Sequence, residues 1–128
     1  MQKNRKILIV DDEETIVTLL ETILGVHGYE SYACKNPAFA VSKAQDVSPD
    51  LILLDIAMPG IDGYEICQLL KNNEQTSHIP VLMVTALALN QDKIKGFESG
   101  ADGFIFKPFE PQAIIKEIEK LLKSSGES

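Results

Sequence analysis

The stretch LILLDIAMPG, Leu51 to Gly60, decides how the chain folds. Four apolar residues, Leu51 to Leu54, lead directly into the carboxylate of Asp55, and Met58-Pro59-Gly60 then breaks the segment. A continuous apolar run of this length is typical of a strand covered on both faces of a parallel sheet. The acid that follows is expected at the open edge of the sheet, because a fully buried charge would lose its hydration.

Apolar runs of strand length recur along the chain and alternate with segments of helical period. The pattern predicts strands at 6–10, 29–35, 51–54, 81–85 and 104–106, with helices between them and after the last one. Such alternation is typical of βαβ units on a parallel sheet. We therefore expect an α/β fold with a doubly wound sheet of about five strands, since a closed eightfold barrel needs roughly twice the chain.

The helical segments carry their own start and stop signals. Gly28 is expected to stop the first helix, Asn36-Pro37 to open a short second helix that ends near Gln45, and Asn90 to cap a fourth helix that ends at Gly100. Apolar residues at helical spacing predict the buried faces of the first, third and last helices. These are Ile16, Leu19, Leu20, Ile23 and Leu24; Ile66, Leu69 and Leu70; and Ile114, Ile115, Ile118, Leu121 and Leu122.

Composition narrows the class of protein. The 128 residues fit one domain, and a net charge of −7 argues against direct binding to the phosphate backbone of nucleic acid. The two cysteines, Cys34 and Cys67, have no metal-site spacing and predict reduced thiols in a cytoplasmic protein. Neither a signal peptide nor an apolar run of about 18 residues is present, so no membrane association is expected.

Polar side chains follow the predicted strands where ligands bind in open α/β sheets, at the carboxyl ends. They are Asp11 and Asp12, Asp55, Thr85 and Lys107. Each has an ordinary structural explanation when taken alone: Asp12 could cap a helix, and Lys107 could be a solvated surface residue. Together, three carboxylates repel each other unless a hard cation such as Mg²⁺ binds them. An aspartate beside Mg²⁺, a hydroxyl and a lysine suits phosphoryl transfer to the aspartate.

The motifs ILIVDDEE, LILLDIAMPGIDG, VLMVTA and FIFKPF, in this order and spacing, resemble the receiver domain of two-component response regulators, the family that includes the chemotaxis response regulator. The resemblance covers essentially the whole chain. It implies a flavodoxin-like strand order of 2-1-3-4-5 with helices on both faces. It also implies a receiver domain over 1–124, followed by a flexible tail or the start of a linker at 125–128.

The resemblance implies a role for each strand-end residue. Asp55 matches the phosphoacceptor, which takes the phosphoryl group from a histidine kinase. Asp11, Asp12, Asp55 and the carbonyl of Ala57 match the Mg²⁺ ligands, with Asp11 acting largely through water. Thr85 matches the switch hydroxyl, and Lys107 matches the lysine that pairs with the phosphoryl group.

Further positions of the family pattern lie in the loops. Met58, Pro59, Gly60 and Ala86 match loops beside the acceptor, and the Lys107–Pro108 bond matches a cis peptide. Phe104 occupies the switch aromatic position, and Phe106, on the same sheet face, is expected to be buried. Ala57 and Leu87 cannot position a water molecule, which predicts slow self-dephosphorylation.

The leading interpretation is a phosphorylation-dependent signalling switch, not an enzyme with an external substrate, although it would catalyse its own phosphorylation and dephosphorylation. Its expected partners are a histidine kinase or phosphotransfer protein, an output partner or effector domain, and a second copy of the chain. The last two would bind the fourth helix, fifth strand and fifth helix, roughly 90–123. One alternative is a haloacid dehalogenase-like phosphatase, which generally needs a second Asp where this chain has Ala57. Another is a receiver that binds partners without phosphorylation.

Overall fold

The computed structural model describes residues 4–58, 60, 62–87 and 89–124, so the expectations for Pro59 and for the tail at 125–128 lie outside the described residues. Five parallel strands form one sheet in the order β2-β1-β3-β4-β5. The strands are β1 (Lys6–Val10), β2 (Glu30–Cys34), β3 (Leu51–Leu54), β4 (Val81–Thr85) and β5 (Gly103–Phe106). The predicted fold class and strand order are confirmed.

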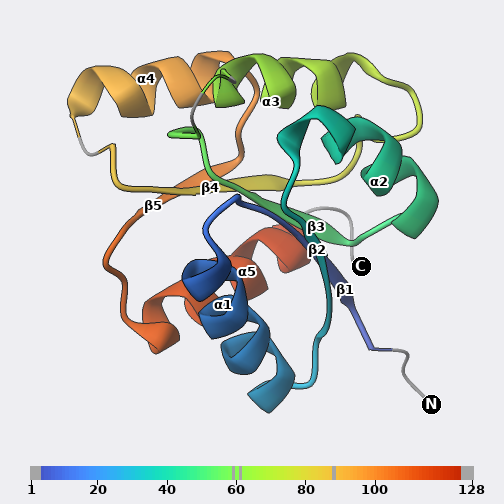
Figure 1. Cartoon of the computed structure of the whole chain (residues 1–128), viewed down its shortest axis with the longest axis vertical. Coiled ribbons are helices and arrows are strands. Elements are labelled where there is room, and N and C mark those ends of the chain that lie inside the picture. Colours follow the sequence, from blue (N-terminus) through green and yellow to red (C-terminus); the bar gives the residue numbers. More distant parts are fainter. Residues whose placement is uncertain (1–3, 59, 61, 88, 125–128) are drawn as a thin grey trace.

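Helices cover both faces of this sheet. They are α1 (Glu14–Val26), α2 (Ala40–Val47), α3 (Gly63–Asn72), α4 (Asn90–Glu98) and α5 (Pro111–Ser124), with a short 3₁₀ helix, η1 (Pro37–Phe39), before α2. Figure 1 shows α2, α3 and α4 above the sheet and α1 and α5 below it. The molecule is thus a three-layer α/β sandwich, as expected of βαβ units wound in both directions.

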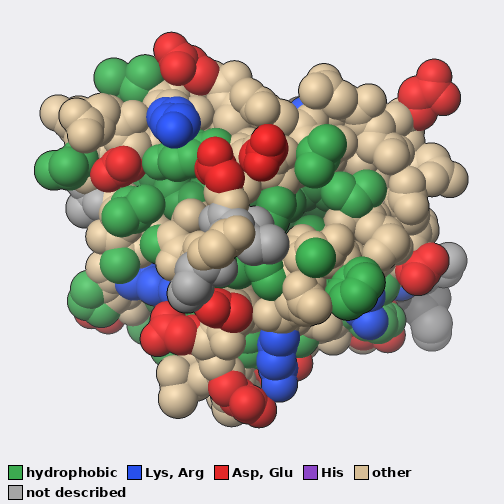
Figure 2. Space-filling model, turned by 45° about the horizontal axis from the view of Figure 1, so that its top comes forward, with side chains coloured by type: hydrophobic (Ala, Val, Ile, Leu, Met, Phe, Trp, Pro, Cys, Tyr) green, Lys and Arg blue, Asp and Glu red, His purple; other side chains and the backbone are tan. Residues whose placement is uncertain are grey.

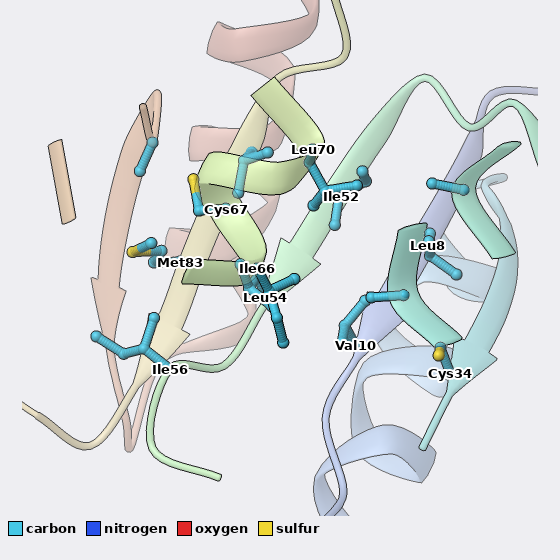
Figure 3. Close-up of a cluster of buried hydrophobic side chains, with 14 of the residues drawn as sticks. Leu8, Val10, Cys34, Ile52, Leu54, Ile56, Ile66, Cys67, Leu70 and Met83 are labelled. Carbon is cyan, nitrogen blue, oxygen red and sulfur yellow. The ribbon is translucent and has the colours of Figure 1, made fainter. Parts of the chain in front are cut away.

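The strands divide the interior into two apolar clusters. Alternate residues of a strand point to opposite faces, so Leu8 faces α2 and α3 while its neighbours Ile7 and Ile9 face α1 and α5. Figure 3 shows the first cluster, where Ile52 and Leu54 lie beside side chains of α3 and Leu8 lies beside α2. Both faces of the central strands are therefore buried, which explains why their sequences are continuously apolar.

Two predicted buried positions are wrong. Leu19 of α1 is 45% exposed and Leu69 of α3 is 55% exposed, whereas the side chains of Val17 and Cys67 are buried instead. Periodicity locates an apolar stripe but not its edges, because the neighbouring layer decides which side of the stripe is covered. The predicted face of α5 is confirmed, since all five of its apolar residues are buried.

The helix ends follow the predicted signals with two differences. Gly28, at φ 84°, ends α1 as expected, and the Asn36 side chain accepts the Ala38 N–H. However, Pro37 opens a 3₁₀ turn, and α2 runs on to Val47. Asn90 lies inside α4; the N-cap position is Leu89, whose N–H donates to the carboxylate of Asp92 at 3.1 Å.

The prediction that Phe106 is buried is also wrong, because 36% of its surface is exposed. It is the last residue of the edge strand β5, and its ring contacts that of Phe104 at 5.2 Å between centroids. Gly96 of α4 lies against Phe104, two residues earlier in the strand. The helix therefore covers the ring of Phe104 and leaves about a third of Phe106 exposed.

The two cysteines are free, as expected, and both are buried. Within the part of the chain that the structure describes, no helix has both the length and the apolar character of a membrane span.

Candidate functional site

The register of the sheet brings Asp11 and Asp55 together. Val10 ends β1 and pairs with Leu54, which ends β3, so the next residue of each strand is an acid. The Asp55 N–H donates to the Val10 carbonyl at 3.0 Å and continues the pairing past the strand ends. This place between β1 and β3 is where the strand order reverses, and open α/β sheets bind ligands at such a point.

Asp12 completes an acidic cluster with Asp11 and Asp55, in which one oxygen of each carboxylate lies within 4.8 Å of the others. Asp11 and Asp55 are only 2% and 5% exposed, whereas Asp12 faces solvent. Asp12 is not the helix cap, because the N-cap of α1 is Glu13. A cluster with oxygen donors alone fits a hard divalent cation such as Mg²⁺, whose positive charge would offset the repulsion.

Lys107 directly follows the edge strand β5 and reaches the cluster along the same carboxyl edge of the sheet. Its Nζ lies 3.0 Å from Asp11 Oδ2 and 3.4 Å from Asp55 Oδ2, and 11% of its side chain is exposed. Burial lowers the pKa of the Lys107 ammonium, but the carboxylates of Asp11 and Asp55 outweigh it and raise the pKa above the ordinary value. The lysine is therefore a fixed positive charge beside both acids.

Burial also acts on Asp11, and it raises the pKa of that carboxyl above its ordinary value. The Glu13 N–H, which donates to Asp11 Oδ1 at 2.9 Å, and the Lys107 ammonium act in the opposite direction. The negative charge of Asp55 adds to the increase. Further positive charge at this place would favour the ionised cluster.

Thr85 and Lys107 are joined through the backbone. Thr85 ends β4, is fully buried and pairs with Phe106 of β5. The Lys107 N–H donates to the Thr85 carbonyl at 2.8 Å. Thr85 Oγ1 accepts the Leu87 N–H at 3.3 Å, which holds the hydroxyl at the start of the loop that leads to α4.

The loops after β3, β4 and β5 surround the site. The Ala57 N–H donates to Asp55 Oδ1 at 3.0 Å and fixes the orientation of that carboxylate. Ala57 itself is exposed, while its neighbours Ile56 and Met58 are buried. Gly60 has φ 74°, a value that glycine adopts without strain. Beyond the other strands, Ala86 is exposed and the Lys107–Pro108 bond is cis, as expected.

Phe104 connects the sheet to α4. Its ring is partly buried, and it lies 6.4 Å from the ring of Phe97 between centroids. A Cβ added to Gly96 would lie 2.8 Å from Phe104 Cε2 and 2.9 Å from Met83 Sδ, so glycine is what lets α4 approach this closely.

One contact of the site was not predicted. Glu13 Oε1 lies 3.4 Å from Lys107 Nζ, so a third acid contacts the lysine. Acids at this place in a sequence are also typical of a helix N-terminus, which is a simpler explanation for Glu13. The sequence did contain a signal for this contact. Glu13 lies just past the central strand β1 and Lys107 just past β5, and both strands end at the same edge of the sheet.

Fold and site together define an open α/β domain with an acidic cation site and a lysine at its switch point. The chain belongs to the response regulator receiver domain family, whose model matches residues 7–119. Domains of this family work in phosphorylation-based signalling.

Individual relatives agree with this membership. The DNA-binding dual master transcriptional regulator RpaA of Synechocystis sp. is 41% identical over 118 residues, which cover 92% of this chain and 49% of the relative. The chain thus spans about half the length of this curated relative. The structure of chemotaxis protein CheY4 of Vibrio cholerae has a TM-score of 0.87 and 30% identity, covering 92% of this chain and 98% of that one.

A third relative bears on the acidic cluster. The receiver domain of sensor histidine kinase PA1611 from Pseudomonas aeruginosa PAO1 was solved with a magnesium ion coordinated in its active site cleft. It has a TM-score of 0.87 and 26% identity and covers 95% of this chain and 100% of that one. Receiver domains therefore bind Mg²⁺ at a site of this kind.

Proposed function

We propose that this chain is a phosphorylation-activated signalling switch that accepts a phosphoryl group on Asp55 from a histidine kinase or phosphotransfer protein, in a Mg²⁺-dependent reaction. One observation carries the proposal. The Asp55 carboxylate directly follows a buried strand, lies within 4.8 Å of two other acids and contacts the Lys107 ammonium. Positive charge at such a place stabilises an anionic group during its transfer.

In the proposed reaction an Asp55 oxygen forms a bond to phosphorus while the P–N bond of the donor phosphohistidine breaks. The imidazole leaves with the electron pair and takes up a proton, and an acyl phosphate remains on Asp55. Lys107, which contacts Asp11 and Asp55 in the resting protein, pairs with an oxygen of the new phosphoryl group. The Thr85 hydroxyl donates a hydrogen bond to a second phosphoryl oxygen.

Asp11, Asp12, Asp55 and the Ala57 carbonyl are the groups that would hold Mg²⁺, with Asp11 acting largely through water. When bound, the ion would supply positive charge that, together with the Lys107 ammonium, neutralises the phosphoryl oxygens. The support for Asp11, Asp12 and Asp55 as ligands is the oxygen-only cluster that their carboxylates form, and the Ala57 carbonyl is included on the resemblance to the family.

Movement of Thr85 and Phe104 toward the phosphoryl group is proposed to shift an existing equilibrium between two arrangements of α4. The output surface would be α4, β5 and α5, which would bind an output partner, an effector domain or a second copy of the chain. Figure 2 shows hydrophobic side chains gathered over the α4 side of the molecule, at the left. Ile94 and Phe97 of α4 are 59% and 45% exposed, and Phe106 of β5, whose ring contacts that of Phe104, is 36% exposed.

The remaining parts of the proposal concern context. The receiver domain would span 1–124, in the cytoplasm, with no direct contact to nucleic acid or membrane. Contact with DNA, where it occurs, would be made by an output domain such as the one implied by the name of the relative RpaA.

Reaction with a small phosphodonor and Mg²⁺, followed by intact-mass measurement, tests the central proposal. The wild type should gain the mass of one phosphoryl group, and Asp55→Asn should gain nothing. The matched control is Asp46→Asn, the same change at an exposed aspartate of α2, which should react like the wild type. Removal of Mg²⁺ with a chelator should abolish the gain. A gain that survives in Asp55→Asn would place the acceptor elsewhere.

Slow hydrolysis of the acyl phosphate is a further part of the proposal. Ala57 and Leu87, two residues past Asp55 and Thr85, have side chains that can neither position nor activate water. Ala57→Asn and Leu87→Glu should each accelerate loss of the phosphoryl group, by about tenfold if the new group acts as a weak general base or orients water. Unchanged hydrolysis in both variants would contradict this part alone.

A further inference from the structure

Tyr64 of α3 contacts the first two turns of α4. Its hydroxyl donates to the backbone carbonyl of Asp92 at 3.2 Å, and the nearer carboxylate oxygen of Asp92 lies 3.5 Å away. The ammonium of Lys95, one turn further along α4, lies 4.7 Å from the centre of the Tyr64 ring. One aromatic side chain therefore contacts α4 by a hydrogen bond and by a cation–π interaction.

Tyr64 itself is fixed to the segment that follows Asp55. Its N–H donates to the Asp62 side chain at 3.0 Å, which caps α3. The ring is 9% exposed and belongs to the same apolar cluster as Ile56 and Met58. A Cβ on the preceding residue, Gly63, would collide with the backbone of Ile56, so α3 lies directly against this segment. The loop after the acceptor is thus in contact with the start of α3, next to Tyr64.

Few other contacts hold α4 in place. Of its nine residues, all described by the structure, Gly96 is the one that is buried. Ile94 and Phe97 expose about half of their surfaces to solvent, at 59% and 45%. A helix with so little buried apolar surface depends more on its polar contacts, and its position shifts at a small energetic cost.

The hydroxyl of Tyr64 is in the right state to serve as the donor. Burial raises the pKa of Tyr64 above its ordinary value, and the negative charge of Asp92 adds to the increase. The phenol therefore remains protonated over the range in which the protein functions, and it can donate to the Asp92 carbonyl continuously.

We propose that Tyr64, through Asp92 and Lys95, is a latch that holds α4 in the arrangement of the unphosphorylated protein. Because Gly63, the neighbour of Tyr64, packs directly against Ile56, a change at Asp55 reaches α4 along the α3 side of the site. This connection is separate from the one through Thr85 and Phe104, which approaches α4 from the β5 side. The regulatory role rests on the proposed function, whereas the latch itself is a property of the resting protein.

Hydrogen exchange of the resting protein tests the latch without Mg²⁺ or phosphodonor. Tyr64→Phe removes the hydroxyl and keeps the ring, so the amides of residues 92–96 should exchange about 2- to 10-fold faster, as expected for loss of one hydrogen bond. Tyr32→Phe is the matched control, because Tyr32 is partly buried in the same apolar cluster and lies in β2. Its exchange in α4 should equal that of the wild type.

Lys95→Gln provides a second variant that does not endanger folding, since Lys95 is exposed. It should accelerate exchange in the same amides by a smaller factor. In the double variant Tyr64→Phe/Lys95→Gln, the increase in exchange rate should differ from the product of the two single increases, because both changes affect the contacts of one side chain. Unchanged exchange in both single variants would overturn the latch.

Binding of beryllofluoride, a stable analogue of the phosphoryl group, with Mg²⁺ tests the regulatory role. Tyr64→Phe should bind it about 2- to 10-fold more tightly, because weakening the resting arrangement raises the fraction of competent protein. Faster exchange with unchanged beryllofluoride affinity would overturn the regulatory role. A wild type that neither binds beryllofluoride nor gains a phosphoryl group would instead contradict the proposed function, and the exchange result would still decide whether the latch exists.

Discussion

Helices α4 and α5 flank the same edge strand, β5, but they are held by different means. Five apolar side chains of α5 are buried, whereas α4 buries Gly96 and contacts its neighbours through Tyr64 and Phe104. Each fully buried aliphatic side chain contributes about 1.5–3 kcal/mol. The comparison shows that one sheet carries a helix anchored by buried side chains beside another helix with little buried apolar surface.

The largest expected effect is on α5. Ile118→Ala removes a side chain with no exposed surface, which should lower the free energy of unfolding by about 2–5 kcal/mol. Ile94→Ala, the same change on α4 at a residue that is 59% exposed, should change it by no more than about 0.5 kcal/mol. Urea titrations of both variants measure the difference. Equal losses would show that α4 is as firmly packed as α5.

The next largest effect is expected in the wild type, where amide hydrogen exchange should be faster in α4 than in α5. Amides of α5 near Ile118 should open only with global unfolding, while those of α4 should open locally at a cost at least about 2 kcal/mol lower. The difference follows from the buried surface of each helix and requires no variant. Protection of α4 equal to that of α5 would remove the basis for treating α4 as the movable element.

A smaller effect is expected from Gly96→Ala. The added Cβ would lie 2.8 Å from Phe104 Cε2 and 2.9 Å from Met83 Sδ, and overpacking of about 1–3 kcal/mol should exceed the gain of about 1 kcal/mol in helix propensity. We expect a net loss of about 1 kcal/mol in the free energy of unfolding, with the Phe104 ring displaced toward solvent.

Gly25→Ala in α1 is the matched control for this change, because a Cβ at Gly25 would meet nothing within 4 Å. It should stabilise the protein by about 0.5–1 kcal/mol. Thermal unfolding of both variants shows whether each substitution raises or lowers the stability of the protein. A gain for Gly96→Ala would mean that α4 can retreat from the sheet without loss.

Much of the fold could be predicted because the sheet is buried on both faces. The runs at 7–10, 51–54 and 81–84 had to be strands between two layers, and the helices between them imposed parallel pairing. The amphipathic face of α5 was equally clear, since its apolar residues repeat at helical spacing. The faces of α1 and α3 were predicted less well, because Leu19 and Leu69 extend the stripe onto a side that no layer covers.

The candidate site likewise contains some contacts that the sequence predicted and others that it did not. Asp11, Asp55 and Lys107 were predicted to meet because each directly follows a strand, and parallel strands end at one edge of the sheet. The Glu13–Lys107 contact and the Tyr64–Asp92 hydrogen bond were not predicted. Both depend on where long side chains reach across neighbouring elements, and sequence spacing does not encode that distance.

The sequence by itself determined the layered α/β architecture and the kind of chemistry at its edge, because strand period, strand-end acids and helix signals are local properties of the chain. The tertiary structure alone decided the register that joins Val10 to Leu54, the pairing of Lys107 with acids from two other strands, and the exposure of Phe106. It also decided that α4 packs against Phe104 at Gly96 and is hydrogen-bonded to Tyr64 through Asp92. These features arise from contacts between residues distant in sequence, which packing fixes only when all the layers are in place.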